Sequence, residues 1–111
     1  EAVDELKAFG DRIIEVPGKR GLNAFVQTEL EGTLAKNEIE NVVFAGAVTS
    51  ICIDSTARAA YEYGYRVFIL EDCTAARTDA EQDFFCGVVF PTYATISDSN
   101  TTLDCLSNLN V

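Results

Sequence analysis

The sequence predicts an α/β fold in which a parallel sheet carries helices on both faces. Two apolar runs, at residues 41–47 and 66–70, are typical of strands buried on both faces. The segment between them, residues 50–63, has the apolar spacing of a helix. Strands that alternate with single helices form parallel sheets with right-handed crossovers, and ligands bind at the carboxyl ends of such strands.

The first elements are shorter than these. Residues 12–16 are predicted to form a strand that a Pro-Gly turn closes. Residues 25–37 are predicted to form a helix because Val26, Leu30 and Leu34 recur at four-residue spacing.

The later elements follow the same alternation. The helix at 50–63 is expected to end at Gly64, because glycine tolerates the left-handed conformation common after a helix. Three further elements complete the pattern: a helix at 79–88, a strand at 93–96 and a terminal helix at 101–109.

Composition bounds the class of protein. Residues 1–111 are expected to form a single domain, and 48% hydrophobic residues suit a globular protein. The formal net charge is -10 and no lysines or arginines cluster, so we expect no nucleic-acid partner. The longest apolar run, residues 42–48, is too short to span a bilayer, so no membrane partner is expected.

The four cysteines are Cys52, Cys73, Cys86 and Cys105, and no two form a C-x-x-C pair. We expect free, buried thiols in a reducing compartment, and hence a cytoplasmic protein. The chain also contains no histidine, so neither a metal site nor another cofactor is expected within it.

The turn at residues 46–52 is where chemistry is expected, because it leaves a buried strand and enters a helix whose first turn holds Cys52. Thr49 or Ser50 is predicted to cap that helix by accepting a bond from a backbone N–H. Backbone amides and the helix dipole favour an anion there, which suits a thiolate nucleophile and an oxyanion. The alternative is that Cys52 is a small apolar residue at the helix–sheet contact, and spacing alone favours it.

Two longer segments carry a more specific signal. Residues 43–60 read VFAGAVTSICIDSTARAA, followed by GYRV at 64–67 and ED at 71–72, and residues 19–25 read KRGLNAF. They resemble the isochorismatase-like hydrolase superfamily, with its G-x-x-T-x-x-C turn, T-A-R-like helix and upstream K-x-R-Y-S-A-F segment. That family includes nicotinamidases, N-carbamoylsarcosine amidases, ureidoacrylate amidases and isochorismatases. Its fold is a Rossmann-like parallel sheet.

The resemblance implies a role for individual residues. Cys52 is the expected nucleophile, which attacks a carbonyl or amide carbon and forms a covalent intermediate, and Lys19 is the expected catalytic lysine beside it. The Ala47–Val48 bond is expected to be cis, and the N–H groups of Val48 and Cys52 are expected to form the oxyanion hole. Phe25 aligns with an aromatic residue near the substrate pocket, although a place in the core is an equally good prediction.

The family's third catalytic residue, an aspartate at the end of its first strand, has no counterpart here. Only a short segment precedes Lys19, and its nearest carboxylate, Asp11, stands at the start of a predicted strand. The chain is therefore expected to lack the first strands of the family fold and to form an incomplete domain. By the same resemblance we expect a homo-oligomer.

The function expected from the resemblance is hydrolysis of a small amide, ureide or carbamoyl C–N bond through a thioester-type intermediate, with a small molecule as partner and no cofactor. Two alternatives stay open. One is hydrolysis of the vinyl ether of isochorismate, although a cysteine at position 52 favours amide-type substrates. The other is a catalytically incomplete relative that acts through binding or assembly.

Overall fold

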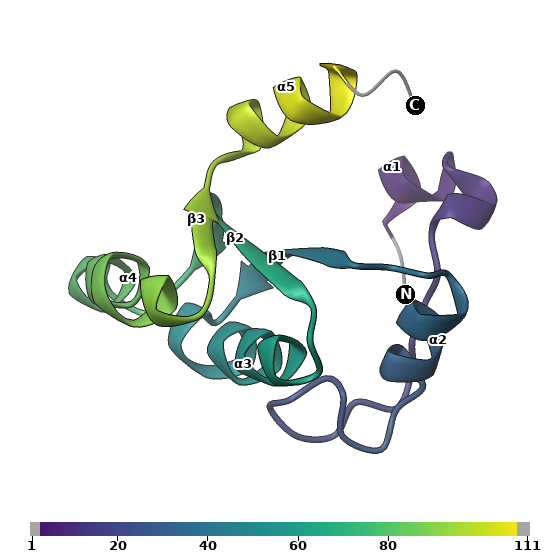
Figure 1. Cartoon of the computed structure of the whole chain (residues 1–111), viewed down its shortest axis with the longest axis horizontal. Coiled ribbons are helices and arrows are strands. Elements are labelled where there is room, and N and C mark those ends of the chain that lie inside the picture. Colours follow the sequence, from purple (N-terminus) through teal and green to yellow (C-terminus); the bar gives the residue numbers. More distant parts are fainter. Residues whose placement is uncertain (1–2, 109–111) are drawn as a thin grey trace.

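The computed structural model describes residues 3–108 and contains a three-stranded parallel sheet in the order β1-β2-β3 (Figure 1). The strands are β1 (Asn41–Ala47), β2 (Arg66–Ala75) and β3 (Thr95–Ser97). Parallel neighbours joined through helices confirm the predicted α/β class.

Five α-helices accompany the sheet within the described residues. They are α1 (Asp4–Lys7), α2 (Leu30–Lys36), α3 (Asp54–Glu62), α4 (Asp79–Phe84) and α5 (Ser99–Asn108). A π-helical turn, Thr49–Ile53, runs directly into α3, and a second one, Phe85–Val89, extends α4. Short 3-10 turns at Gly10–Arg12 and Phe90–Thr92 complete the list.

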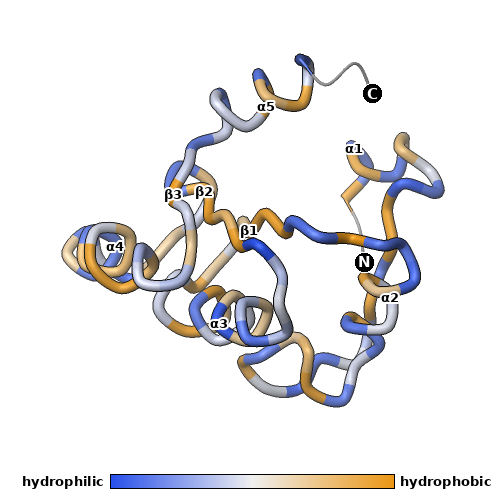
Figure 2. Tube along the Cα trace, in the orientation of Figure 1, coloured by the Kyte–Doolittle hydropathy of each residue, from blue (hydrophilic) through white to orange (hydrophobic). Residues whose placement is uncertain are grey.

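The helices lie on both faces of the sheet, as predicted. Figure 1 shows α3 and α4 on one face and α5 on the other, while α1 and α2 lie to the side near the start of β1. Figure 2 shows the hydrophobic residues of β1 and β2 running through the middle of the molecule. No helix among residues 3–108 is both long and apolar enough to cross a bilayer.

The core lies between the sheet and the α3–α4 side. Along β2, Val67 and Ile69 point to this face and are 4% and 0% exposed. They belong to one cluster with Ala57 and Ala60 of α3 and with Phe90, whose ring follows α4 in the chain. The full buried set is Phe25, Ile53, Ala57, Ala60, Val67, Ile69 and Phe90.

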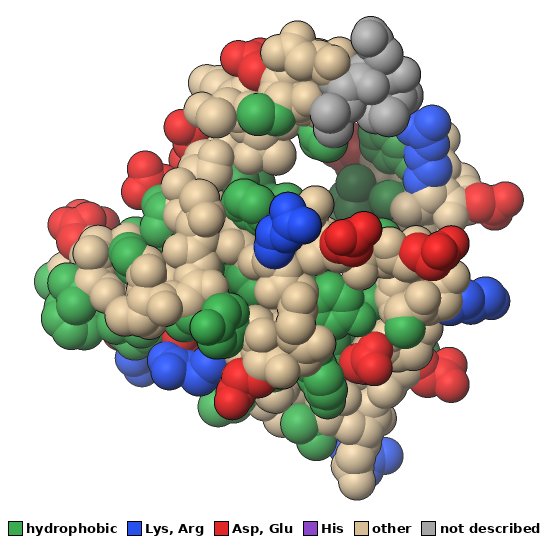
Figure 3. Space-filling view, viewed as in Figure 1, with side chains coloured by type: hydrophobic (Ala, Val, Ile, Leu, Met, Phe, Trp, Pro, Cys, Tyr) green, Lys and Arg blue, Asp and Glu red, His purple; other side chains and the backbone are tan. Residues whose placement is uncertain are grey.

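The opposite face is only partly covered. Val43 of β1 is 47% exposed, so the prediction that this strand is buried on both faces is wrong. The physical reason is the position of α5, which leaves a groove of about 280 Å³ between itself and Val43 and Phe68. Hydrophobic side chains surround the opening between α5 and the sheet in the space-filling view (Figure 3).

The predicted strand at 12–16 is also wrong. Residues 10–12 form a 3-10 turn, the following residues are irregular, and Ile14 is 55% exposed. A strand needs a neighbour for its N–H and C=O groups, and no strand among residues 3–108 pairs with this segment.

The predicted helix at 25–37 forms only from Leu30 onward. Residues 24–27 form turns, and Gln27 has a φ of 54°. Tertiary packing explains the late start of the helix. Phe25 lies in the core and is 6% exposed, and the turns at residues 24–27 bring it there.

Most of the remaining boundaries are close to the predictions, but β2 continues to Ala75, five residues beyond the predicted strand at 66–70. The strand predicted at 93–96 is β3, two residues later at its start, and the helix predicted at 101–109 starts at Ser99; its last residue, 109, lies outside the described residues. Gly64 follows α3 with a φ of 100°, which confirms the predicted left-handed end.

Candidate active site

The candidate site is the turn between β1 and α3. Gly46 has a φ of 124°, a conformation that residues with a Cβ rarely adopt, so the chain can leave the strand sharply here. The Ala47–Val48 bond that follows is cis. Cys52 then lies in the π-helical turn Thr49–Ile53, half-buried at the carboxyl end of β1.

Lys19 lies directly beside this cysteine. Its Nζ is 3.6 Å from the Sγ of Cys52 and donates a hydrogen bond to the carbonyl oxygen of Gly21 at 2.6 Å. These residues are more than thirty positions apart, and only the fold brings them together. An ammonium group at this distance favours the thiolate form of a cysteine, which is the form that acts as a nucleophile.

Thr56 of α3 holds the loop that carries Lys19. Its Oγ1 accepts a hydrogen bond from the backbone N–H of Ala24 at 3.0 Å and donates one to the carbonyl of Leu22 at 3.4 Å. Thr56 is only 5% exposed and lies one helical turn after Cys52. The loop is thus fastened to the same helix that presents the cysteine.

The other side of the turn is tied to α4. Thr49 Oγ1 donates to Oε1 of Gln82 at 2.6 Å, and Ser50 Oγ donates to Oε1 of Glu81 at 2.7 Å. Neither Thr49 nor Ser50 caps the helix that follows, so the capping prediction is wrong. Two N–H donors of the first turn are satisfied by a backbone carbonyl instead, since the N–H groups of residues 51 and 53 both donate to the carbonyl of Val48.

Glu81 is also paired with a cation. Nη2 of Arg77 lies 2.8 Å from Oε2 of Glu81. Hydrogen bonds from Arg77, and then from Ser50, lower the pKa of this carboxyl group to about 2. Glu81 is therefore a carboxylate at any ordinary pH and serves as an acceptor rather than as an acid.

Phe25 lies behind the site. Its ring is 6% exposed and packs on Tyr63 with the ring centroids 5.0 Å apart. Two roles were predicted for Phe25, and the structure shows the one in the core. Contact with a substrate stays a prediction.

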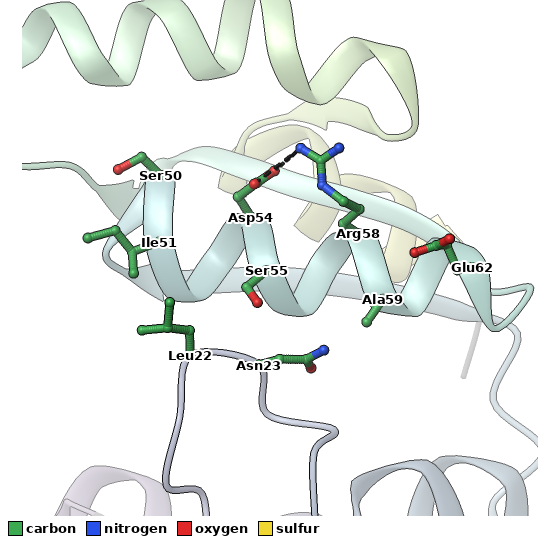
Figure 4. A pocket seen from close by; sticks show the side chains of 9 residues that line it. All are labelled: Leu22, Asn23, Ser50, Ile51, Asp54, Ser55, Arg58, Ala59 and Glu62. Atoms are coloured by element: carbon green, nitrogen blue, oxygen red, sulfur yellow. Dashed lines mark hydrogen bonds and ion pairs between the residues drawn. The ribbon is translucent and has the colours of Figure 1, made fainter.

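A shallow groove runs along the outer side of α3, next to the site. Figure 4 shows Leu22 and Asn23 of the loop opposite Ser55 and Ala59 of the helix, with Asp54 and Arg58 joined by an ion pair. The groove has a volume of about 490 Å³, but neither Cys52 nor Lys19 lines it. It therefore lies beside the Cys52–Lys19 pair rather than around it.

The structure also places the cysteines and Asp72. All four cysteines are free, but Cys73 and Cys105 are exposed rather than buried. Asp72 accepts hydrogen bonds from the N–H and the hydroxyl of Ser99, and the hydroxyl bond is the main reason that its pKa is lowered. Asp72 thus serves as a structural acceptor. Among residues 3–108, no group of three or more His, Cys, Asp or Glu side chains could hold a metal ion.

The sequence reasoning missed the roles of Thr56, Glu81 and Gln82. Thr56 follows Cys52 at four-residue spacing, which places both on one face of a helix, and the sequence offers no other signal for its role. Glu81 and Gln82 lie more than thirty residues from their partners, Ser50 and Thr49, in a segment with no recognisable motif.

Comparison with known proteins shows the family of this chain. The model of the isochorismatase domain matches residues 1–101. The chain belongs to the isochorismatase family. Among its relatives, the uncharacterised family protein YwoC of Bacillus subtilis is 32% identical over 91 residues, which are 82% of this chain and 47% of YwoC.

Several relatives have named activities. The ureidoacrylate amidohydrolase RutB of Yersinia enterocolitica is 31% identical over 107 residues, 95% of this chain and 45% of RutB. The structure of N-carbamoylsarcosine amidase from Thermoplasma acidophilum superposes with a TM-score of 0.63 at 35% identity, covering 73% of this chain and 46% of that one. The chain spans about half the length of the curated relatives that it matches.

Proposed function

We propose that the protein carrying this chain is a cysteine hydrolase that cleaves a C–N bond in a small amide, ureide or carbamoyl compound. The observation that carries the proposal is the 3.6 Å contact between Lys19 Nζ and Cys52 Sγ at the carboxyl end of β1. Ligands bind at this edge of a parallel sheet, and a cation beside a thiol activates it as a nucleophile.

In the proposed reaction the Cys52 thiolate attacks the carbonyl carbon of the substrate. The carbonyl oxygen becomes an oxyanion, which the N–H groups of Val48 and Cys52 stabilise, as such donors do in acyl transfer. The C–N bond then breaks, the nitrogen leaves with a proton, and a thioester on Cys52 remains. Water hydrolyses the thioester, which gives the acid product and the free thiol.

One group carries the proton in this scheme. The family pattern assigns the thiol proton to an aspartate, which we expect in the sequence upstream of this chain. That carboxylic acid then returns the proton to the leaving nitrogen. The role of Lys19 in this proposal is electrostatic: its ammonium group stabilises the thiolate before the attack.

The substrate class rests on the named relatives. An amidohydrolase of ureidoacrylate and an amidase of N-carbamoylsarcosine both cleave C–N bonds next to a carbonyl group. We extend this class, but neither individual substrate, to the present protein. By the family resemblance we also expect the whole protein to form a homo-oligomer, which its mass in solution would test.

The test replaces Cys52 in the whole protein. We expect Cys52→Ala to lower the rate of hydrolysis by about 10⁴-fold or more, the scale seen when a nucleophile is removed. Lys19→Met should lower it less, because the nucleophile remains. Cys105→Ala is the matched control, since Cys105 is an exposed cysteine far along the chain in α5. The substrates are nicotinamide, ureidoacrylate and N-carbamoylsarcosine.

The second measurement traps the covalent intermediate on Cys52. Mass spectrometry of the protein quenched during turnover should show an acyl group on the peptide that contains Cys52. Full activity of Cys52→Ala would contradict the proposal. Turnover of isochorismate in place of every amide would favour the vinyl-ether alternative, and a folded protein without any turnover would favour a role in binding or assembly.

A further inference from the structure

Gln82 of α4 lies where the pairing of β1 and β2 is irregular. Phe44 is paired with Ile69, but two residues later Gly46 is paired with Thr74, so β2 contains extra residues at this point. Such an irregularity removes backbone groups from the ladder. Nε2 of Gln82 donates to the carbonyl oxygen of Glu71 at 3.1 Å and to Oγ1 of Thr74 at 3.0 Å, and it thereby holds the bulged segment.

The other end of the same amide reaches the turn that carries Cys52. Oε1 of Gln82 accepts a hydrogen bond from Oγ1 of Thr49 at 2.6 Å. Thr49 is fully buried, with an exposed fraction of 0%, so water does not compete for this bond. Thr49 begins the π-helical turn in which Cys52 lies.

Only an amide can make this pattern of contacts. A glutamine side chain offers donors and an acceptor at the same time, whereas a glutamate carboxylate only accepts and a methionine thioether does neither to any useful extent. The amide of Gln82 therefore fits its position: its N–H groups face the acceptors of β2, and its oxygen faces the hydroxyl group of Thr49.

We propose that Gln82 is a positioning residue, which fixes the turn bearing Cys52 and the oxyanion amides against the carboxyl end of β2. Its catalytic consequence rests on the function proposed above. Displacing a reacting group by a fraction of an ångström is costly, and a misplacement of about 1 Å can reduce the rate by 10²-fold. Gln82 itself does not touch the sulfur, so it acts through Thr49 and not on the substrate.

The kinetic test uses isosteric variants in the whole protein. Gln82→Met and Thr49→Val should each lower kcat by about 10- to 100-fold and leave KM nearly unchanged, since they disturb positioning and not binding. Thr49→Ser keeps the hydroxyl and should keep most of the activity. The double variant should be no worse than the poorer single variant, because both changes break one connection. Gln27→Met is the matched control at an exposed glutamine.

A second measurement needs no substrate. Iodoacetamide labelling followed by peptide mapping gives the alkylation rate of Cys52, with Cys105 as an internal reference in the same sample. Gln82→Met and Thr49→Val should slow the labelling of Cys52, because its sulfur moves away from Lys19, while Cys105 reacts as before. A folded Gln82→Met protein with wild-type kcat, or with Cys52 labelling as fast as the wild type's, would overturn the positioning role.

The two measurements separate this inference from the proposed function. If the wild-type protein hydrolyses none of the C–N substrates, the function fails, and the labelling comparison still decides the role of Gln82. If Cys52 is essential and the folded Gln82→Met protein is fully active, only the positioning role fails. Should Gln82→Met not fold, the contrast between Thr49→Val and Thr49→Ser decides the question, and equal kcat in these two variants would overturn it.

Discussion

The two faces of the sheet are built from similar residues and have different surroundings. Val67 of β2 faces α3 and α4 and is 4% exposed, whereas Val43 of β1 faces the α5 side and is 47% exposed. The first face is closed by packed rings and alanines, while the second borders an open apolar groove beneath α5. The candidate site is anchored to the closed face, where α3 and α4 both contribute contacts.

This difference teaches that burial is decided by what packs above a strand and not by the strand's own hydrophobicity. The position of the turn that carries Cys52 also depends on this packing. The turn with Cys52 is fastened on one side through Thr56 and on the other through Gln82, and both ties belong to the closed side. The open face contributes no contact to either tie.

The largest effect expected from this comparison concerns Phe90. Its ring is 0% exposed and packs on Phe85 and Tyr93, so Phe90→Ala should lower the free energy of unfolding by about 3–5 kcal/mol. Phe84→Ala is the matched control, because Phe84 is 55% exposed, and it should cost much less. Urea unfolding of both variants measures the difference. Equal losses would show that the closed face is no better packed than the surface.

A smaller effect separates the two valines directly. Val67→Thr places a hydroxyl group in the core and should cost about 1–3 kcal/mol, because nothing there is arranged to bond it. Val43→Thr is the same change on the open face and should stay within about 0.5 kcal/mol. The measurement is again urea unfolding. A cost at Val43 similar to that at Val67 would mean that the open face is covered in the protein in solution.

The smallest effect is electrostatic and depends on pH. The bonds from Arg77 and Ser50 lower the pKa of Glu81 to about 2, from an ordinary value of 4.5. A carboxyl group with a lowered pKa stabilises the folded state fully above its unfolded pKa, and this contribution is lost as the pH falls through about 2. The apolar contacts of the closed face should not respond in this range.

Glu81→Gln isolates that contribution. The stability of the wild-type protein should fall more steeply than that of Glu81→Gln between about pH 4.5 and pH 2, while the two should run parallel above this range. Thermal unfolding across a pH series measures both curves. Parallel curves throughout would exclude a role for the Glu81 carboxylate in fastening the Cys52 turn.

The sequence by itself determined the central elements and the turn that carries Cys52. The strands at 41–47 and 66–70, the helix that ends at Gly64 and the adjacency of Lys19 and Cys52 were all predicted. Strand and helix patterns are local, so they can be recognised from spacing, and the two residues lie in motifs that resemble one family.

Tertiary structure decided the rest. Residues 12–16 form no strand because no described strand lies beside them, and the helix expected from residue 25 starts at Leu30 because Phe25 packs into the core. Thr49 and Ser50 suit a helix cap by residue type, yet they donate to Gln82 and Glu81, more than thirty residues away. A side chain with both donor and acceptor capacity takes whichever partner the packing brings within reach, and local sequence carries no information about that choice.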